Sequence, residues 1–319
     1  MNIRALLILC VASVVAGGAA AQSFPAKPVR IIVPFAPGGA TDLIARTVGQ
    51  KMSEQMGQPV VVENRTGGGG NVGTEAIVRA APDGYTIGIC GASTTIAPAL
   101  NKSLPYDVAR DLVGIATMTS GDNILIVPAS SPAKDVKELV ALLKQKGDKA
   151  NYASAAVGGS THLATELFKM ETGTTALHIP FRGSAPALVE LIAGRVDLMF
   201  DNIPPGLPHI KAGTLRALAS SGQQRNATLP DVPTFKELGI AVDVTSWAGL
   251  CAPVGTPRPV IEKLAAEITK AIESPDVKAK LGEAGQATFR MGPEQLQQRL
   301  ASEVARWKKV AEVAKLKIE

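Results

Sequence analysis

The residues of this chain that could do chemistry are concentrated in four short loops rich in glycine, serine and threonine. Each loop follows an apolar run typical of a β-strand and precedes a stretch typical of a helix. The loops span Pro34–Asp42, Gly91–Thr95, Val157–His162 and Arg182–Ala185. Glycine lets a ligand approach the backbone closely, and free amides at a helix N-terminus attract an anion. One such loop is more typical of an ordinary turn, but four of them predict a cradle for a small anion.

The polar side chains of these loops are mostly hydroxyls. Those expected to add hydrogen-bond donors are Ser93, Thr94, Ser160 and Thr161. Arg182 is the one cation in the predicted cradle, where it could pair with a carboxylate, although an exposed arginine is an equal interpretation.

Two acidic residues border the predicted cradle. Asp42 stands at a helix start, where capping is the expected role of its side chain. Asp201 ends the strand-like run VDLMFD. It either faces the cleft, where it would receive an amine or a hydroxyl, or caps the turn that follows.

Catalytic and metal-binding patterns are sparse. The chain has three histidines, His162, His178 and His209, and it contains no HExxH, CxxC or G-x-S-x-G motif. Ser160 and His162 are two residues apart, but no acidic residue is placed to orient the histidine. His162 therefore fits better as a pocket-lining residue at a helix start than as a catalytic base, and we expect no catalytic residue, cofactor or metal.

The segment Gly68–Gly73 matches the dinucleotide-binding pattern G-x-G-x-x-G. A dinucleotide site also needs an acidic residue about 20 positions on, at the end of the next strand. That strand ends in Cys90, Gly91 and Ala92, without an acid. Dinucleotide binding is therefore disfavoured.

Composition excludes several classes of protein. The 319 residues are 46% hydrophobic and 19% charged, which predicts a folded chain with a sizeable core rather than a disordered one. The formal net charge is +5, no more than two basic residues are consecutive, and only 4% of residues are aromatic. Nucleic-acid binding is disfavoured, because it relies on basic clusters and on aromatic stacking.

The N-terminus resembles a secretory signal peptide. A basic start precedes the apolar run Ala5–Val15, and Ala19–Ala21 supplies small residues for cleavage before Gln22. The apolar run is shorter than the ~18 residues that a membrane span needs. We expect residues 1–21 to be removed after Ala21 and the mature protein to be periplasmic.

Two cysteines remain in the mature chain, Cys90 and Cys251, and each ends a strand-like run. They could form a disulfide in an oxidising compartment if their strands are neighbours. Two separately buried cysteines are an equally good interpretation.

Strand-like and helix-like segments alternate along the chain, which is typical of α/β proteins with mainly parallel sheets. Two successive series predict two lobes, with crossings near Gly121–Asn123 and Gly239–Asp243. Lobe 1 would comprise residues 22–122 and 243–319, and lobe 2 residues 123–242. We expect separate strands at Leu112–Thr119 and Ile124–Val127.

Seven segments in order cover essentially the whole mature chain and resemble one family, the Bug-type or TctC substrate-binding proteins of tripartite tricarboxylate transporters. These segments are Phe24–Asp42 (FPAKPVRIIVPFAPGGATD), Val61–Gly73, Ala81–Thr86, Gly158–Ala164 (GGSTHLA), His178–Gly183 (HIPFRG), Val196–Asn202 and Trp247–Pro257. Phe181 departs from the family pattern, which often has tyrosine there, and Cys90 is not expected at its position.

The resemblance implies a two-lobed periplasmic binding fold, type II-like, with a ligand cleft between lobes that close on a hinge. It implies a non-enzymatic, monomeric receptor that captures a small carboxylate and delivers it to the membrane permease of a tripartite-type transporter. Two alternatives remain: a sensor that presents its ligand to a membrane signalling protein and, less favoured, an exported α/β enzyme that uses Ser160 and His162. Carried over by position, the ligand-binding residues are Phe35, Gly38, Gly39, Asp42, Gly159, Ser160, Thr161, His162, Arg182, Gly183 and Asp201. The sequence leaves open which carboxylate binds and whether a cognate permease exists.

Overall fold

The computed structural model describes residues 24–101 and 103–313, so the predicted signal peptide lies outside the described part. None of the helices within these residues combines the length and apolar character needed to cross a membrane. The described chain also holds no cluster of three or more histidine, cysteine or acidic side chains suited to a metal ion.

Lobe 1 is built around a mixed sheet. Strand β1 (Val29–Val33) lies between β2 (Val60–Asn64) and β3 (Thr86–Gly91), and both pairings are parallel. β3 then pairs antiparallel with β9 (Thr245–Pro253), which pairs antiparallel with β4 (Leu112–Pro128). The short β10 (Ala287–Thr288) adds to β4. The remaining elements of this lobe are η1 (Gly68–Gly70), α2 (Ala40–Met56), α3 (Asn71–Val78), α4 (Ala92–Leu100), α5 (Val108–Asp111), α10 (Arg258–Glu273), α11 (Pro275–Glu283) and α12 (Pro293–Val313).

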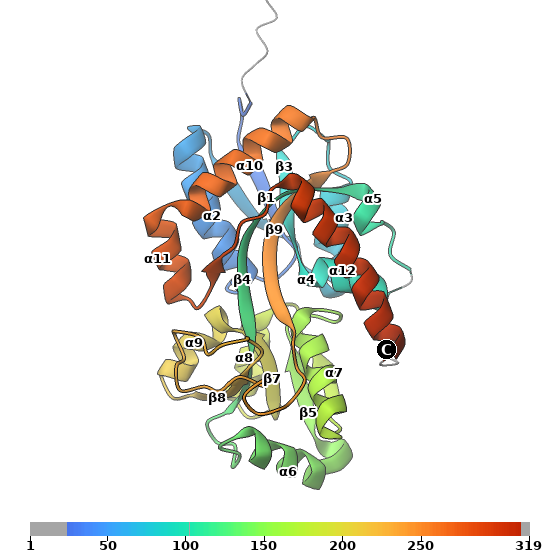
Figure 1. The fold of residues 1–319 in the computed structure, drawn as a ribbon, viewed down its shortest axis with the longest axis vertical. Helices are drawn as coiled ribbons and strands as arrows, with labels where there is room; N and C mark the ends of the chain where they lie inside the picture. The colour runs from blue at the N-terminus through green and yellow to red at the C-terminus, as the bar shows by residue number, and fades with distance from the viewer. Residues whose placement is uncertain (1–23, 102, 314–319) are drawn as a thin grey trace, which may run out of the picture.

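Lobe 2 repeats the design with a smaller sheet. Strand β5 (Asn151–Ser154) lies between β6 (Leu177–Pro180) and β7 (Leu198–Asn202), again in parallel. The C-terminal half of β4 pairs antiparallel with β7 and with β8 (Leu215–Ser220). The other elements of lobe 2 are α6 (Val136–Lys146), η2 (Gly147–Lys149), α7 (Ser160–Thr172), α8 (Ser184–Ile192) and α9 (Ile203–Lys211). Figure 1 shows the lobes one above the other, joined by β4 and β9.

The prediction of two separate strands on either side of residues 120–123 is wrong, because β4 runs through this segment without a break. Ser120 pairs with Trp247 of β9 and with Ala287 of β10, and Asn123 pairs with Asn202 of β7. Glycine, aspartate and asparagine are turn-prone residues. Here, pairing to strands distant in sequence overrides that local preference.

The cores explain why these segments form helices. In α2, Ile44, Val48 and Met52 recur every four residues and are buried against the lobe 1 sheet. The helix ends at Gly57, whose φ of 65° is the left-handed conformation that glycine adopts without a steric penalty. α10 and α11 cover the same face as α2, while α3, α4 and α12 contribute to a second cluster on the other face. β1 is therefore covered on both faces, with Ile31 and Val33 in the first cluster and Ile32 in the second, while Arg30 near its start is exposed.

Two further features of the fold are a disulfide and a proline-rich helix. The disulfide decides between the two interpretations that the sequence left open for Cys90 and Cys251. Cys90 on β3 and Cys251 on β9 form a disulfide, with Cα atoms 5.8 Å apart, because their strands are antiparallel neighbours. Helix α9 forms in a segment that contains three prolines. Two of these lie in its first turn, where a missing amide hydrogen costs nothing.

Candidate functional site

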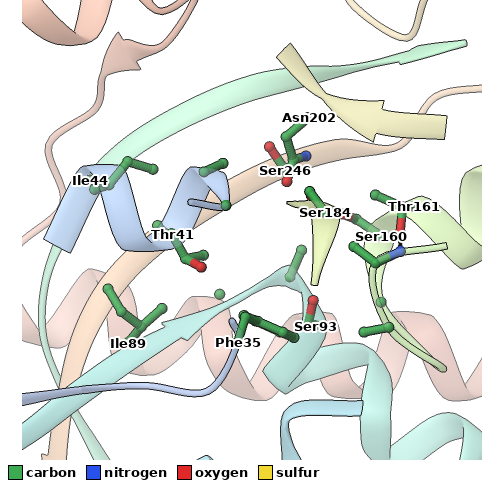
Figure 2. Close-up of a pocket in the computed structure, with 18 of the residues that line it drawn as sticks. Phe35, Thr41, Ile44, Ile89, Ser93, Ser160, Thr161, Ser184, Asn202 and Ser246 are labelled. Carbon is green, nitrogen blue, oxygen red and sulfur yellow. Dashed lines mark hydrogen bonds between the residues drawn. The ribbon is translucent and has the colours of Figure 1, made fainter. Parts of the chain in front are cut away.

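A cavity of about 60 Å³ lies where the two lobes meet, and Figure 2 shows its lining. Since a single water needs roughly 10–15 Å³ of such space, the cavity has room for a small organic molecule. All of the residues that line it are uncharged. They are Pro34, Phe35, Gly39, Ala40, Thr41, Ile44, Ile89, Gly91, Ala92, Ser93, Thr94, Thr119, Ala155, Ala156, Gly159, Ser160, Thr161, Gly183, Ser184, Asn202, Ser246, Trp247, Ala248 and Gln286.

Four helices begin at this cavity, two from each lobe. Their N-cap residues are all glycines that line the cavity: Gly39 of α2, Gly91 of α4, Gly159 of α7 and Gly183 of α8. No N-cap side chain satisfies a first-turn amide of these helices. These N–H groups lack partners within their helices and carry the positive end of the helix dipole. The cavity is therefore a site of positive potential without a cationic side chain.

Hydroxyl groups add further donors. Thr94 Oγ1 accepts a hydrogen bond from the Gly91 amide at 3.2 Å, and Thr161 Oγ1 accepts one from the Ala155 amide at 3.2 Å. Each hydroxyl therefore keeps its own hydrogen available for a ligand.

Two cavity-lining polar atoms are buried without a hydrogen-bond partner among the described residues. They are Thr119 Oγ1 on β4 and Gln286 Nε2 beside β10. Leaving a buried polar atom unpaired costs about 1–3 kcal/mol, so such atoms favour a ligand or an ordered water.

Eight of the residues expected to bind ligand line the cavity. They are Phe35, Gly39, Ser93, Thr94, Gly159, Ser160, Thr161 and Gly183. Five other expected residues do not: Gly38, Asp42, His162, Arg182 and Asp201.

Asp42 and Gly38 shape the first loop from behind. One Asp42 oxygen accepts from the Gly38 amide at 3.1 Å, and the other accepts from Asn64 Nδ2 at 2.9 Å. Arg46 forms an ion pair with the same carboxylate at 2.9 Å. Burial acts to raise the pKa of Asp42, but hydrogen bonds from Arg46, Asn64 and Gly38 outweigh it and hold the pKa below its ordinary value. Asp42 is thus ionised and holds the loop in place. It accepts from the amide of Gly38, which precedes α2, rather than from an amide of the helix itself, so it does not have the expected capping role.

His162 supports the second loop rather than lining the cavity. Its Nδ1 accepts a hydrogen bond from the Gly158 amide at 3.1 Å, which requires that nitrogen to be unprotonated. Its ring stacks on that of His178, with ring centroids 4.1 Å apart. Burial lowers the pKa of His162, although the nearby Glu166 carboxylate opposes the shift. The histidine is therefore a neutral support for the backbone of the loop.

Arg182 is exposed, and its main chain rather than its guanidinium contributes to the site. The Arg182 carbonyl accepts a hydrogen bond from the Ala36 amide at 3.0 Å, which ties lobe 2 to lobe 1 beside the cavity.

Asp201 is fully buried behind the cavity wall. Its Oδ1 accepts from the Ser184 hydroxyl at 2.6 Å and from the Asn202 amide at 2.9 Å. Burial raises the pKa of Asp201 to about 7, and the bonds from Ser184 and Asn202 oppose the shift. Asp201 therefore neither faces the cleft nor acts as a simple cap. It is a buried acceptor for Ser184, which does line the cavity.

Several cavity residues escaped the sequence analysis: Thr41, Thr119, Ser184, Asn202, Ser246 and Gln286. Thr41 follows the predicted Gly39 by two residues and Ser184 directly follows the predicted Gly183, both in loops already recognised, so their position in the first helical turn was a usable signal. Thr119 and Ser246 lie within strands, and Gln286 precedes β10. These three reach the cavity only through the pairing of β9 and β10 with β4.

The chain is similar to known receptor proteins in both sequence and fold. Residues 44–316 match the family model described as "Tripartite tricarboxylate transporter family receptor" (TctC). The Bordetella pertussis protein BugT is 36% identical over 314 residues, covering 96% of each chain. MatC from Rhodopseudomonas palustris, solved with bound malate, is 34% identical with a TM-score of 0.86, covering 90% of this chain and 99% of MatC. R. palustris Rpa4515 with adipate is 34% identical with a TM-score of 0.88, covering 92% of this chain and 98% of that protein. The chain therefore belongs to the TctC family of tripartite tricarboxylate transporter receptors.

Proposed function

We propose that this protein is a periplasmic solute receptor that binds one small organic carboxylate between its lobes. The observation that carries the proposal is the meeting of four glycine-capped helix N-termini at one cavity without charged side chains. Each such terminus stabilises an anion by ~0.3–1 kcal/mol when exposed and by up to ~2 kcal/mol when partly buried. Four termini together supply what a lysine or arginine would otherwise provide. Malate and adipate, bound by two similar proteins, are both carboxylates.

The proposed ligand-binding residues are those predicted residues that line the cavity, together with Thr119 and Gln286, whose unpaired atoms favour a ligand. We place the division between lobes at residues 122/123 and 242/243. Since the family model describes transporter receptors, the proposed partner is a membrane permease that accepts the captured carboxylate from a monomeric receptor.

A non-catalytic role is part of this proposal. The Ser160 hydroxyl is directed at Asn123 Oδ1, 3.5 Å away, and His162 Nδ1 is occupied by the Gly158 amide. The two side chains that an exported hydrolase would need thus bond to different partners.

Native mass spectrometry of the mature protein, followed by denaturation and identification of released molecules, tests the proposal. One carboxylate per chain is the expected result. A Gly39→Leu variant should lose it, because this N-cap has an ordinary φ of −82° and a β-carbon there would lie 3.7 Å from its nearest neighbour, so the added side chain fits the fold and fills the cavity. Overpacking of ~1–3 kcal/mol corresponds to roughly a five- to 150-fold weaker affinity.

The matched control is Gly292→Leu. A β-carbon at Gly292 would meet nothing within 4 Å, and this residue does not line the cavity. This variant should retain the ligand. Equal ligand retention by both variants would contradict the site assignment, and release of a non-anionic molecule would contradict the ligand class.

A further inference from the structure

The hydroxyl groups around the cavity do not all present the same polarity to a ligand. Thr94 and Thr161 accept backbone N–H bonds, and so each can donate its hydrogen into the cavity. Ser184 is the opposite case, because its hydroxyl donates to Asp201 Oδ1 at 2.6 Å. A hydroxyl has one hydrogen and two lone pairs, so Ser184 Oγ can offer a ligand only lone pairs.

The direction of this hydrogen bond is fixed by the environment of Asp201. Oδ1 also accepts the Asn202 amide hydrogen at 2.9 Å, which keeps a proton off this oxygen. Oδ2 is buried without a partner among the described residues, so any proton on the carboxyl group belongs there. Ser184 therefore donates to Oδ1 whether Asp201 is ionised or protonated.

Ser184 also contributes a backbone donor at the same place. It is the first residue of α8 and is 5% exposed, and its N–H has no partner within the helix. One residue thus offers the ligand an acceptor, Oγ, and a donor, the amide. A ligand atom satisfies both only if it can accept one hydrogen bond and donate another.

We propose that the cavity wall at Ser184, which Asp201 supports from behind, is a subsite for a hydroxyl group, and that the preferred ligand is a hydroxycarboxylate. This inference rests on the proposed function, because the carboxylate itself is assigned to the N-termini of the other three helices, α2, α4 and α7. A hydroxyl oxygen accepts from the Ser184 amide while its hydrogen is donated to Ser184 Oγ.

Other groups fit this wall less well. A carboxylate oxygen would face the lone pairs of Oγ and lie close to the buried Asp201 carboxyl. A methylene would leave both groups of Ser184 unpaired. An ammonium group would satisfy Oγ but not the amide, since it has no lone pair to accept with.

The test is isothermal titration calorimetry on mature protein that has been freed of bound ligand by unfolding and refolding without reductant. Three ligand pairs differ by a single hydroxyl: malate and succinate, 2-hydroxyglutarate and glutarate, lactate and propionate. We expect the better-fitting hydroxy acids to bind about tenfold more tightly than their partners, as one extra buried hydrogen bond would give. Equal binding within every pair overturns this inference while leaving the proposed function intact.

Two variants assign the preference to this wall. Ser184→Ala removes Oγ without removing a cap, since the N-cap of α8 is Gly183, and it should bring the members of a pair to within about twofold of each other. The matched control Ser93→Ala removes a cavity hydroxyl on α4 of lobe 1 and should weaken both members of a pair equally. A preference that survives Ser184→Ala overturns the assignment.

Two further outcomes of the calorimetry would contradict the proposal. Tighter binding of aspartate than of malate would identify an ammonium rather than a hydroxyl at the subsite and overturn the proposal. Absence of binding by every carboxylate would contradict the proposed function and this inference together. If a variant fails to fold, the wild-type comparison within the pairs still decides.

Discussion

Gly69 of lobe 1 lies directly against the main-chain carbonyl of Val157 in lobe 2. A β-carbon on Gly69 would come within 2.3 Å of the Val157 oxygen, closer than real atoms approach. The hydrogen bond from the Ala36 amide to the Arg182 carbonyl is a second main-chain contact between the lobes. The lobes therefore meet through backbone atoms beside the cavity, and a side chain at Gly69 would hold them apart.

Gly69→Ala should weaken ligand binding through this clash. Gly68→Ala is the matched control, because both glycines have positive φ, 69° and 55°, but a β-carbon on Gly68 would meet only its own segment at 3.6 Å. Both variants carry a similar backbone penalty. The clash adds ~1–3 kcal/mol, or roughly five- to 150-fold in dissociation constant, to Gly69→Ala alone. Calorimetry with the recovered carboxylate measures the difference, and equal affinities would show that this contact is not required for binding.

His178 should make a contribution to folded stability that declines in mild acid. Burial is the main cause that lowers the pKa of His178 from its ordinary 6.5 to about 4, and the adjacent His162 ring adds to the shift because two protonated imidazoles would repel each other. The unfolded chain therefore binds a proton in this interval that the folded chain does not, and folded stability declines as pH falls from about 6.5 to about 4. The melting temperature of His178→Gln relative to wild type should therefore rise as pH falls from 8 to 4. Parallel curves would contradict this role of His178.

Asp201 should act in the opposite direction over a similar interval. Burial raises its pKa from 3.8 to about 7, so the folded chain holds a proton that the unfolded chain releases. This group alone makes the protein more stable as pH falls from about 7 to about 4. Asp201→Asn removes the buried charge. The melting temperature of this variant relative to wild type should therefore rise between pH 5 and pH 8, and a difference independent of pH would contradict the shifted pKa.

The disulfide should contribute substantially to folding stability. Cys90 and Cys251 are 161 residues apart in sequence, so the bond closes a long loop in the unfolded chain. Such bonds typically contribute ~2–5 kcal/mol. Replacing both cysteines with alanine should lower the free energy of unfolding in urea by about this amount. A reductant should lower the stability of wild type alike and leave the variant unchanged, whereas a reductant effect on the variant would point to another cause.

The site was predictable from sequence where it is built from local signals. A glycine at the end of an apolar strand and a hydroxyl in the next helical turn are adjacent in the chain, so Gly39, Gly159 and Ser160 could be recognised directly. Thr119 and Ser246 carry no such signal, because they enter the cavity through the pairing of β4 with β9, across more than 120 residues.

Charged residues were the least predictable part of the site. Sequence position placed Asp42, Arg182 and Asp201 in the site, and each of them is adjacent in sequence to a residue that lines the cavity. Whether a charged side chain enters a cavity depends on its partners, however, and those partners are tertiary. Asn64 and Arg46 hold Asp42 behind its loop, and Ser184 stands between Asp201 and the cavity.

The division of the four glycine-capped helices between the lobes has a consequence for the kinetics of capture. α2 and α4 belong to lobe 1, and α7 and α8 to lobe 2, so each lobe alone presents only half of the amide donors. A carboxylate can then land on one half at a rate set by diffusion, and the second half engages it without a further encounter. Release of a carboxylate held in this way would require the lobes to separate, so its residence time would be set by that opening. A permease that pulls the lobes apart would thereby release the cargo without competing for any of its hydrogen bonds.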